Sequence, residues 1–253
     1  MKFESKNIEP LIESLKINYK SWILIVVSLY FINPLNVGGS LFTFLVMIVI
    51  VHVVHYFAHC ESGYPGNLVH LYHHDHNNWF SHFIQVVLEF VALTSIILIK
   101  NFGGTGIFYK YFAQFMDEWI IWFTYIFYTT VHNINYSYFH VNKIHEMHHA
   151  LKLQNIGPDI CDVLFGTKHD AENDLENTDH YIPNIVIASL LVWFMKYVWN
   201  SSENKETYIV IFCVIFAVCT VLLLETTAIL YIQKTMIPTR DPYTVPTKSC
   251  DNV

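Results

Sequence analysis

Residues 41–59 read LFTFLVMIVIVHVVHYFAH, an apolar run whose second half contains three histidines. A membrane-spanning helix needs about 20 predominantly apolar residues, and this run approaches that length. His55 and His59 are four residues apart, so on a helix they lie on one face about 6 Å from each other, close enough to share a metal ion. The stretch therefore predicts a membrane helix with a metal-binding end.

The composition of the whole chain agrees with a membrane protein. Of its 253 residues, 53% are hydrophobic and 14% are charged, whereas a soluble domain carries about 25% charged residues. The net charge of −7 and the lack of a basic cluster in the sequence argue against a nucleic-acid partner. The five cysteines are scattered without a CxxC pair, which argues against a thiolate metal site.

Apolar runs alternate with turn-forming residues along the chain. Several runs are too short to span a membrane alone, so paired helices explain them better than independent spans. The turns at 33–39 and 103–106 and the polar segment 200–206 separate the members of these pairs. We therefore expect an all-α, multi-pass transmembrane helical bundle with about four to six membrane helices. The runs are 22–33, 41–59, 83–99, about 112–131, 185–199 and 208–232.

The lysines predict the orientation of this bundle. If the N-terminus is cytosolic, the histidine-rich segments 52–82 and 132–180 share its side of the membrane. Ten Lys and Arg residues then lie on the cytosolic side and three on the other, in agreement with the positive-inside rule. We expect a multi-pass protein of an endoplasmic reticulum-type membrane, if the source is eukaryotic, with its histidines at the cytosolic face.

Two further histidine boxes have identical spacing, HLYHH at 70–74 and HEMHH at 145–149. Their histidines at i, i+3 and i+4 lie on one side of a helix. A lone histidine on an apolar face is usually structural, but three boxes favour a metal site. Neutral imidazole suits zinc, copper, iron and nickel. The boxes supply eight imidazoles, more than one ion can use, so two ions are predicted.

Other histidines are harder to assign from spacing. His132 and His140 could raise the number of ligands to ten, although their spacing does not match one helical face, and a structural role is the alternative. Whether His52, His76 and His82 also bind metal stays open.

The motifs together resemble the fatty acid hydroxylase and sterol desaturase superfamily of integral-membrane, non-haem di-iron enzymes. The resemblance covers about residues 50–170. Besides the boxes, it rests on HxxxY at His132 and on NIG at 155–157 followed by DVLFGT at 162–167, which is similar to the signature after the last box of that superfamily. Acyl-lipid desaturases are less similar, because their first two boxes usually lie further apart than the ten residues between His59 and His70.

This resemblance implies a di-iron oxidoreductase that uses O2 and two electrons to attack a C–H bond of a lipid. We expect hydroxylation of a fatty-acyl, sphingolipid or sterol substrate, with desaturation at the same site as the alternative. No cytochrome b5 module is fused to the chain, so a separate electron-transfer protein such as cytochrome b5 is expected. The implied iron ligands are His55, His59, His70, His73, His74, His132, His140, His145, His148 and His149.

No catalytic side chain is expected beyond the metal ligands. Asp162, Asp75 or Glu146 could orient a ligand histidine from behind, with solvation or helix capping as the alternative. Within the apolar runs, Glu89, Glu225 and Lys196 call for a partner or a role, and a structural pair is the favoured interpretation.

The sequence departs from the superfamily in three ways. His132 and His140 are eight residues apart, wider than is usual there, and Tyr56 replaces an arginine that often follows the first histidine. Two further apolar helices also follow the Phe-Gly-Thr end. A non-enzymatic membrane protein that binds or transports metal is the rival function, and it would place its ligands deep in the membrane helices. A haem held by two imidazoles is a third possibility, which the HxxHH doublets fit poorly.

Four segments follow from these expectations. They are a cytosolic amphipathic N-terminal segment (1–20), a fatty acid hydroxylase-like catalytic domain (21–180), a C-terminal transmembrane hairpin (181–234) and a polar tail (235–253).

Overall fold

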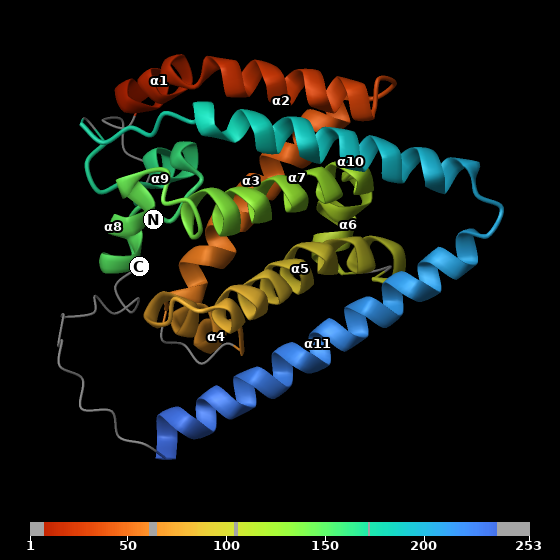
Figure 1. Cartoon of the computed structure of the whole chain (residues 1–253). Coiled ribbons are helices and arrows are strands. Elements are labelled where there is room, and N and C mark those ends of the chain that lie inside the picture. Colours follow the sequence, from red (N-terminus) through yellow and green to blue (C-terminus); the bar gives the residue numbers. More distant parts are fainter. Residues whose placement is uncertain (1–7, 61–64, 104–105, 172, 237–253) are drawn as a thin grey trace.

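The computed structural model describes residues 8–60, 65–103, 106–171 and 173–236 (Figure 1). Within these ranges the chain forms helices and loops and no strand, so the predicted all-α class is confirmed. Most of the expected polar tail (235–253) lies outside the described residues, and so do residues 1–7 of the expected N-terminal segment. The helices are α1 (Ile8–Ile17), α2 (Tyr19–Ile32), α3 (Val37–Ala58), α4 (Pro65–Asp75), α5 (Trp79–Phe102), α6 (Ile107–Tyr111), η2 (Ala113–Phe115), α7 (Glu118–Thr130), η3 (Val131–Tyr136), α8 (Lys143–Ala150), α9 (Asp159–Phe165), η4 (Asp179–Tyr181), α10 (Ile182–Ser201) and α11 (Lys205–Met236).

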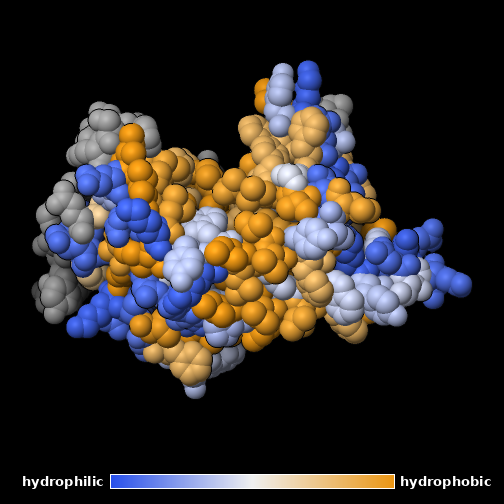
Figure 2. Space-filling model, turned by 90° about the horizontal axis from the view of Figure 1, so that it is seen from above, coloured by the Kyte–Doolittle hydropathy of each residue, from blue (hydrophilic) through white to orange (hydrophobic). Residues whose placement is uncertain are grey.

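Four of the described helices are long and apolar enough to cross a membrane, namely α3, α5, α10 extended by η4, and α11. The bent pair α1 and α2, whose axes differ by 72°, provides up to a fifth span. These numbers agree with the expected four to six membrane helices. Figure 2 shows a broad band of hydrophobic residues between more hydrophilic ends, as a membrane protein requires.

The predicted apolar run at about 112–131 is not one long helix. Its first part is the 3₁₀ turn η2, and α7 begins only at Glu118. Asp117 sets this start, because its carboxylate accepts hydrogen bonds from the backbone N–H groups of Trp119 and Ile120. Helix α7 continues directly into the π-helix η3, and neither is among the candidate spans. Helix α7 lies at the centre of the bundle, in contact with α2, α3, α5 and α10.

Two clusters of buried side chains surround α7. In the first, Phe123 packs with Leu29 of α2, Phe44 of α3 and Ile185 of α10. In the second, Ile121 packs with α3 and α5. Between helices in a bilayer such contacts stabilise mainly through close packing, because lipid tails are as apolar as the side chains they replace.

The long helix α11 lies diagonally across α4 and α5 (Figure 1). Only 6% of its most apolar stretch is buried, so almost the whole helix is left to face lipid. Its inner contacts include Leu223, which packs against Val69 and Ile84, and the rings of Phe212 and Phe216, which lie next to Phe90.

The ionisable residues of the apolar helices have different surroundings. Lys196 of α10 donates a hydrogen bond of 2.9 Å to the carbonyl of Ile32, at the end of α2. Such a contact satisfies one of the last carbonyls of a helix, which has no partner within it. Glu225 is exposed on α11. Glu89 of α5 is buried, and its contacts belong to the site described below.

The short helices α4, α8 and α9 gather at one end of the long helices (Figure 1). The last turn of α3 and the first turns of α5 and α10 point to this end. An Asn78 capping box starts α5, and the Asn142 side chain, which accepts a hydrogen bond from the N–H of His145, starts α8. All three histidine boxes therefore meet in one region.

Candidate metal centre

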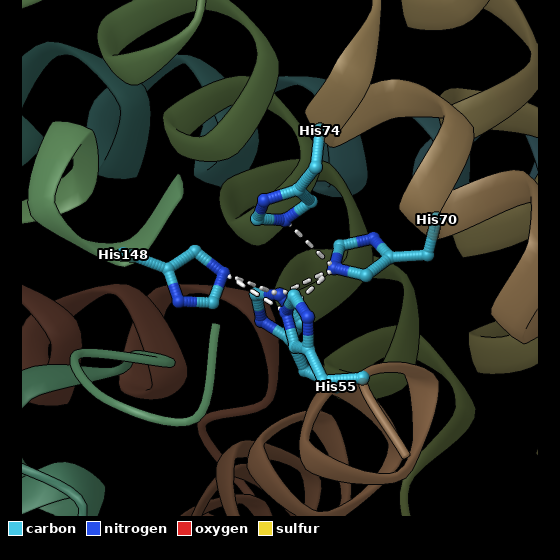
Figure 3. A group of neighbouring side chains, drawn as sticks. His55, His70, His74 and His148 are labelled. Atoms are coloured by element: carbon cyan, nitrogen blue, oxygen red, sulfur yellow. Dashed lines mark hydrogen bonds between the residues drawn. The ribbon is translucent and has the colours of Figure 1, made fainter. Parts of the chain in front are cut away.

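Five histidines from three helices point their rings at one another. We call this set, His55, His59, His70, His74 and His148, the five-histidine centre. One nitrogen from each lies within 4.8 Å of all the others. Neighbouring Nε2 atoms are 2.9–3.2 Å apart. Figure 3 shows the rings of His55, His70, His74 and His148 turned toward a common point.

The local sequence explains this convergence. His55 and His59 are four residues apart at the end of α3, and His70 and His74 have the same spacing on α4. Each pair therefore lies on one helical face. His148 of α8 completes the set, although it is 89 residues beyond His59 in the sequence.

The nitrogen separations suit ligands of one metal ion. A metal–nitrogen distance of about 2.1 Å places two ligands at a right angle about 3.0 Å apart. Hydrogen bonds among the imidazoles cannot explain the contacts equally well. His70 Nε2 faces the Nε2 atoms of His55, His59 and His74 at once, and an imidazole nitrogen carries one proton or one lone pair. Residues and geometry therefore fit a metal ion.

Three of the five outer nitrogens of the centre face other groups, whereas the Nδ1 atoms of His59 and His74 are buried without a hydrogen-bond partner. His70 Nδ1 donates to Gln85 Oε1 (3.1 Å), and His148 Nδ1 donates to the backbone carbonyl of Gln154 (2.9 Å). Because these Nδ1 atoms carry the proton, the Nε2 atoms present lone pairs to the centre. His55 Nδ1 lies 3.4 Å from the hydroxyl of Tyr128.

Burial also keeps the ligands neutral. It lowers the pKa of His70 to about 3, with a contribution from His132. It lowers the pKa of His74 and His148 well below the usual value as well. Since metal binding requires unprotonated imidazole, these groups are ready to bind a metal at neutral pH.

Four more histidines form a second group beside the first. His73, His132, His145 and His149 make a closed circuit of neighbouring rings, with centroids 4.8–5.7 Å apart. Only His145 and His149 have Nε2 atoms in close contact, at 3.1 Å. His132 Nε2 and both nitrogens of His73 are buried without a hydrogen-bond partner. Buried polar atoms without partners indicate a binding site.

Glu89 orients this second group. Its carboxylate lies 2.5 Å from His132 Nδ1, which leaves Nε2 free for a metal. Thr129, Asn133 and Gln85 donate hydrogen bonds to the same carboxylate. Glu89, an ionisable residue of an apolar run, was expected to have a partner within the protein, and that partner is His132. Its partner's identity was not predictable from spacing, because 43 residues separate the two.

Of the ten predicted ligands, the structure brings nine into these two groups and places His140 elsewhere. The side chain of His140 is 52% exposed, and its Nδ1 lies 3.7 Å from the carboxylate of Glu146. Glu146 therefore faces His140 and not a histidine of either group. The role of His140 as a ligand stays a prediction from the resemblance.

The histidines that the sequence left open have separate surroundings. His52 is fully buried, donates from Nδ1 to the Gly157 carbonyl (3.1 Å) and stacks on Phe165, so it supports the loop after α8. His76 is exposed and stacks on Tyr72. His82 lies next to His73, with ring centroids 5.1 Å apart, at the edge of the second group.

Asp162 shapes the loop that carries Gln154. Its carboxylate accepts hydrogen bonds from the N–H groups of Ile156 and Gly157 and from the Thr167 hydroxyl. Burial raises the pKa of Asp162 to about 7. These hydrogen bonds explain why the NIG and FGT segments lie together. The same carboxylate also lies 3.8 Å from Nδ1 of His52.

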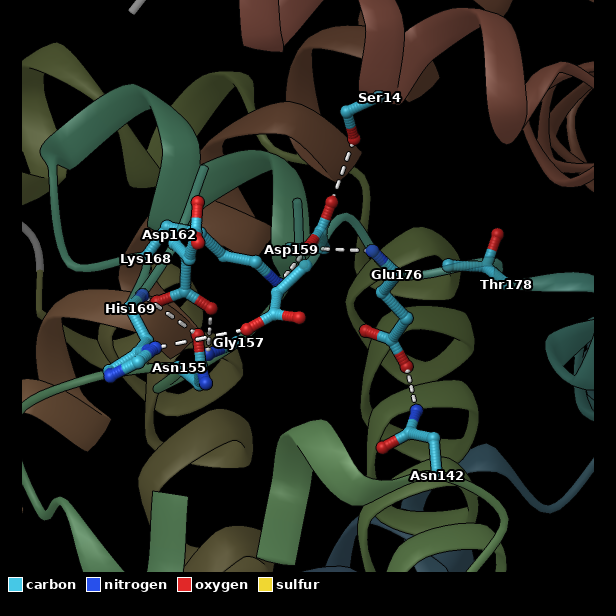
Figure 4. Close-up of polar contacts among 12 residues, drawn as sticks. Ser14, Asn142, Asn155, Gly157, Asp159, Asp162, Lys168, His169, Glu176 and Thr178 are labelled. Carbon is cyan, nitrogen blue, oxygen red and sulfur yellow. Dashed lines mark hydrogen bonds and ion pairs between the residues drawn. The ribbon is translucent and has the colours of Figure 1, made fainter. Parts of the chain in front are cut away.

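Buried carboxylates form a hydrogen-bonded network around Asp159 and Glu176 (Figure 4). Asp159 accepts hydrogen bonds from Ser14 and from the backbone of Glu176, and pairs with Lys168 at 2.5 Å. Glu176 in turn accepts hydrogen bonds from Asn142 and from the hydroxyls of Tyr136 and Tyr181. We call this set the Asp159–Glu176 network. Tyr136 connects it to the second group by stacking on His145, with centroids 4.7 Å apart.

Comparison of the chain with models of protein families, with curated proteins and with solved structures gives no match. What the structure itself defines is a class, a helical membrane protein with a buried histidine cluster that can hold metal. The particular activity is therefore a matter of proposal.

Proposed function

We propose that this chain is a membrane-bound, oxygen-dependent di-iron oxidoreductase that hydroxylates a C–H bond of a fatty-acyl, sphingolipid or sterol substrate. The observation that carries the proposal is the convergence of five Nε2 atoms within 4.8 Å, with four further histidines beside them. Nine imidazoles exceed what one ion can bind, which supports two metal ions. The order of the sequence motifs supports membership of the fatty acid hydroxylase and sterol desaturase superfamily.

The ligand chemistry limits the candidate metals to those that imidazole binds well. The two groups contain only imidazoles, which excludes the thiolate sites of structural zinc and iron–sulfur clusters. Imidazole ligands also suit copper and zinc. We propose iron because the sequence motifs resemble those of the di-iron superfamily. When bound, the iron pair would supply the redox chemistry with O2, using two electrons from a separate protein such as cytochrome b5.

The protein's own residues would hold and orient the metal ligands. Gln85, the Gln154 carbonyl and Glu89 fix the rings of His70, His148 and His132. Burial of these histidines keeps bulk water away from the site. The proposal assigns no side chain as a general acid or base.

The position of the site supports an enzyme over a metal transporter. His55 lies in the last turn of α3 and His59 caps it, while the other ligands come from α4, η3 and α8, which are not among the described candidate spans. A transporter would place its ligands near the middle of the spans. We further propose that this end faces the cytosol, as the lysine distribution predicts.

The proposal is tested by mass spectrometry of total lipids from cells that express the wild-type chain, His148→Ala or His76→Ala, together with an electron donor. A lipid with one additional oxygen, produced by the wild type and by His76→Ala but not by His148→Ala, is the expected result. His76 is an exposed histidine and serves as the matched control. Loss of two hydrogens instead would identify a desaturase. Identical lipids in all samples would contradict the proposal.

A further inference from the structure

A cavity reaches the five-histidine centre from between two membrane helices, α3 and α5. Its apolar wall is made by Val51, Val54 and Ala58 of α3 and by Leu88, Ala92 and Leu93 of α5. Its polar lining consists of His55, His70, Gln85, Glu89 and Tyr128. We call it the α3–α5 cavity.

The lining residues follow one stripe on each helix. On α3 they are at positions 51, 54, 55 and 58, and on α5 at 85, 88, 89, 92 and 93, so both series repeat every three or four residues. The stripe on α3 covers about 10 Å of helix length. Two facing stripes of this kind border a small space of about 40 Å³.

Polarity changes along this space. The polar residues of α5, Gln85 and Glu89, lie near its start, beside the histidines, whereas Ala92 and Leu93 lie further along the helix. Both α3 and α5 are candidate membrane spans, so the apolar part of the cavity lies at membrane depth. Val54 is 44% exposed, which opens the wall to the surroundings of the bundle.

The polar groups in the described lining are already hydrogen-bonded within the protein. Gln85 is bonded to His70 and Glu89. Both Glu89 oxygens are used by α7 and η3 together with Gln85. The Tyr128 hydroxyl faces His55. An occupant with a polar group would find no available partner here except the Nε2 atoms that face the proposed metal, and burying such a group without a partner is costly.

The other cavity next to the histidines differs in this respect. It is lined by His132, His145, Asn155 and Glu176 among others, and both His132 Nε2 and Asn155 Nδ2 are buried there without a partner. Tyr128 lines both cavities and separates them. The α3–α5 cavity is therefore the one suited to hydrocarbon.

We infer that the α3–α5 cavity binds the unbranched hydrocarbon chain of a lipid, which enters from the bilayer and brings its carbons to His55 and His70. This inference rests on the proposed function, because it makes the chain the substrate of that site. The small volume between the two helical stripes fits part of a single chain and not a fused ring system. The small side chains of Ala58 and Ala92 leave the width that the chain requires.

The wild-type protein provides the first test. The full chain is placed in lipid nanodiscs, irradiated with a palmitic acid probe that carries a diazirine in mid-chain, and digested for mass spectrometry. Cross-links within 51–58 and 85–93 that excess palmitic acid removes are expected. Cross-links confined to the lipid-facing surfaces of α10 and α11 would overturn the inference. Preferential labelling of the cavity peptides by a photoactivatable sterol would also overturn it.

A matched pair of substitutions provides the second test. Ala92→Phe fills the cavity and should reduce cross-linking there about tenfold, which corresponds to about 1.4 kcal/mol of binding free energy. Ala217→Phe, at an exposed position of α11, should leave it unchanged. Ala92→Leu adds less volume and should give an intermediate loss, and it keeps the test valid if the larger ring prevents folding. Undiminished labelling in folded Ala92→Phe or Ala92→Leu would contradict the inference.

Bound metal and lipid oxidation are measured on the same preparations, so that the two proposals can fail separately. Specific labelling of the cavity without bound metal would contradict the proposed function and support a hydrocarbon site. Bound metal and lipid oxidation without labelling of the cavity would overturn the inference and leave the proposed function intact.

Discussion

Two buried polar clusters lie at the same end of the helical bundle, and they differ in how their polar atoms are satisfied. In the Asp159–Glu176 network, Asp159 and Glu176 have donors from Ser14, Lys168 and Asn142. In the histidine groups, the Nε2 atoms face one another or face no partner at all. Buried polar groups are normally hydrogen-bonded, so the first cluster has the character of a scaffold and the second that of a binding site.

Mutations in the two clusters should therefore have different effects. Removing a member of the scaffold leaves an uncompensated buried charge and should lower stability. Removing a histidine or its orienting partner should mainly lower metal affinity. Variants of the network are therefore tested for stability, and variants of the histidine groups for metal binding.

The largest effect on stability is expected for Asp159→Ala. Lys168 would lose its ion pair while its side chain is 1% exposed, which should cost about 3–5 kcal/mol. Thermal unfolding of the purified protein in detergent measures the loss. Asp179→Ala, which breaks the half-exposed pair with Lys20, is the control and should have a much smaller effect. Equal melting temperatures for the two variants would contradict a structural role for the network.

Glu89→Gln should weaken binding of the second metal ion about 10–100-fold, the usual effect of losing a partner that orients a ligand histidine. The proton on His132 Nδ1 would no longer be held by a carboxylate. Titration of the metal-free protein with Fe²⁺ measures the affinity. Glu225→Gln alters an exposed acidic residue of another apolar helix, α11, and should bind metal as the wild type does. Unchanged affinity in Glu89→Gln would remove Glu89 from the site.

Glu176→Gln should change the pH dependence of stability. Burial raises the pKa of Glu176 from 4.5 to about 7. Because the folded state then binds this proton more tightly than the unfolded state, the contribution of Glu176 to stability is present below about pH 4.5 and is lost as the pH rises through about 7. The melting temperature of the wild type should therefore fall relative to that of Glu176→Gln as the pH is raised from 5 to 8. These two values lie on either side of that transition. Parallel pH profiles for the two proteins would disprove this linkage.

The smallest effect is expected for His140→Ala. This residue is half-exposed and faces Glu146, so its removal should leave the amount of bound metal unchanged. Elemental analysis of the purified variant tests this. Loss of one ion would instead show that His140 is a ligand, as the resemblance implies, and that the helix end around it rearranges when metal binds.

The sequence was most informative where helical spacing decides the geometry. The spacing of His55 and His59, and of His70 and His74, predicts shared faces, and the structure has them. The spacing did not predict that the histidines of each HxxHH box belong to two different groups. His70 and His74 join the five-histidine centre while His73 joins the second group, because residues at i+3 and i+4 point in different directions from the helix axis.

Partners that lie far apart in sequence could not be predicted in this way. Gln85 and Glu89 were part of an apolar run, and only the packing of α5 against α4 and α7 brings them to His70 and His132. Likewise, the apolar run at about 112–131 did not reveal that Asp117 starts a short central helix. Local patterns determine faces and ends of helices, whereas the packing of helices determines which faces meet.

The proposed function requires two iron ions in the two histidine groups, so the number of bound metal ions is the measurement that decides it. Wild-type and His148→Ala protein, purified from cells grown with iron, would be measured by inductively coupled plasma mass spectrometry. We expect two iron ions per wild-type chain and fewer in the variant, in which His148 no longer completes the five-histidine centre. Wild-type protein without stoichiometric metal, or a variant with the same metal content, would contradict it.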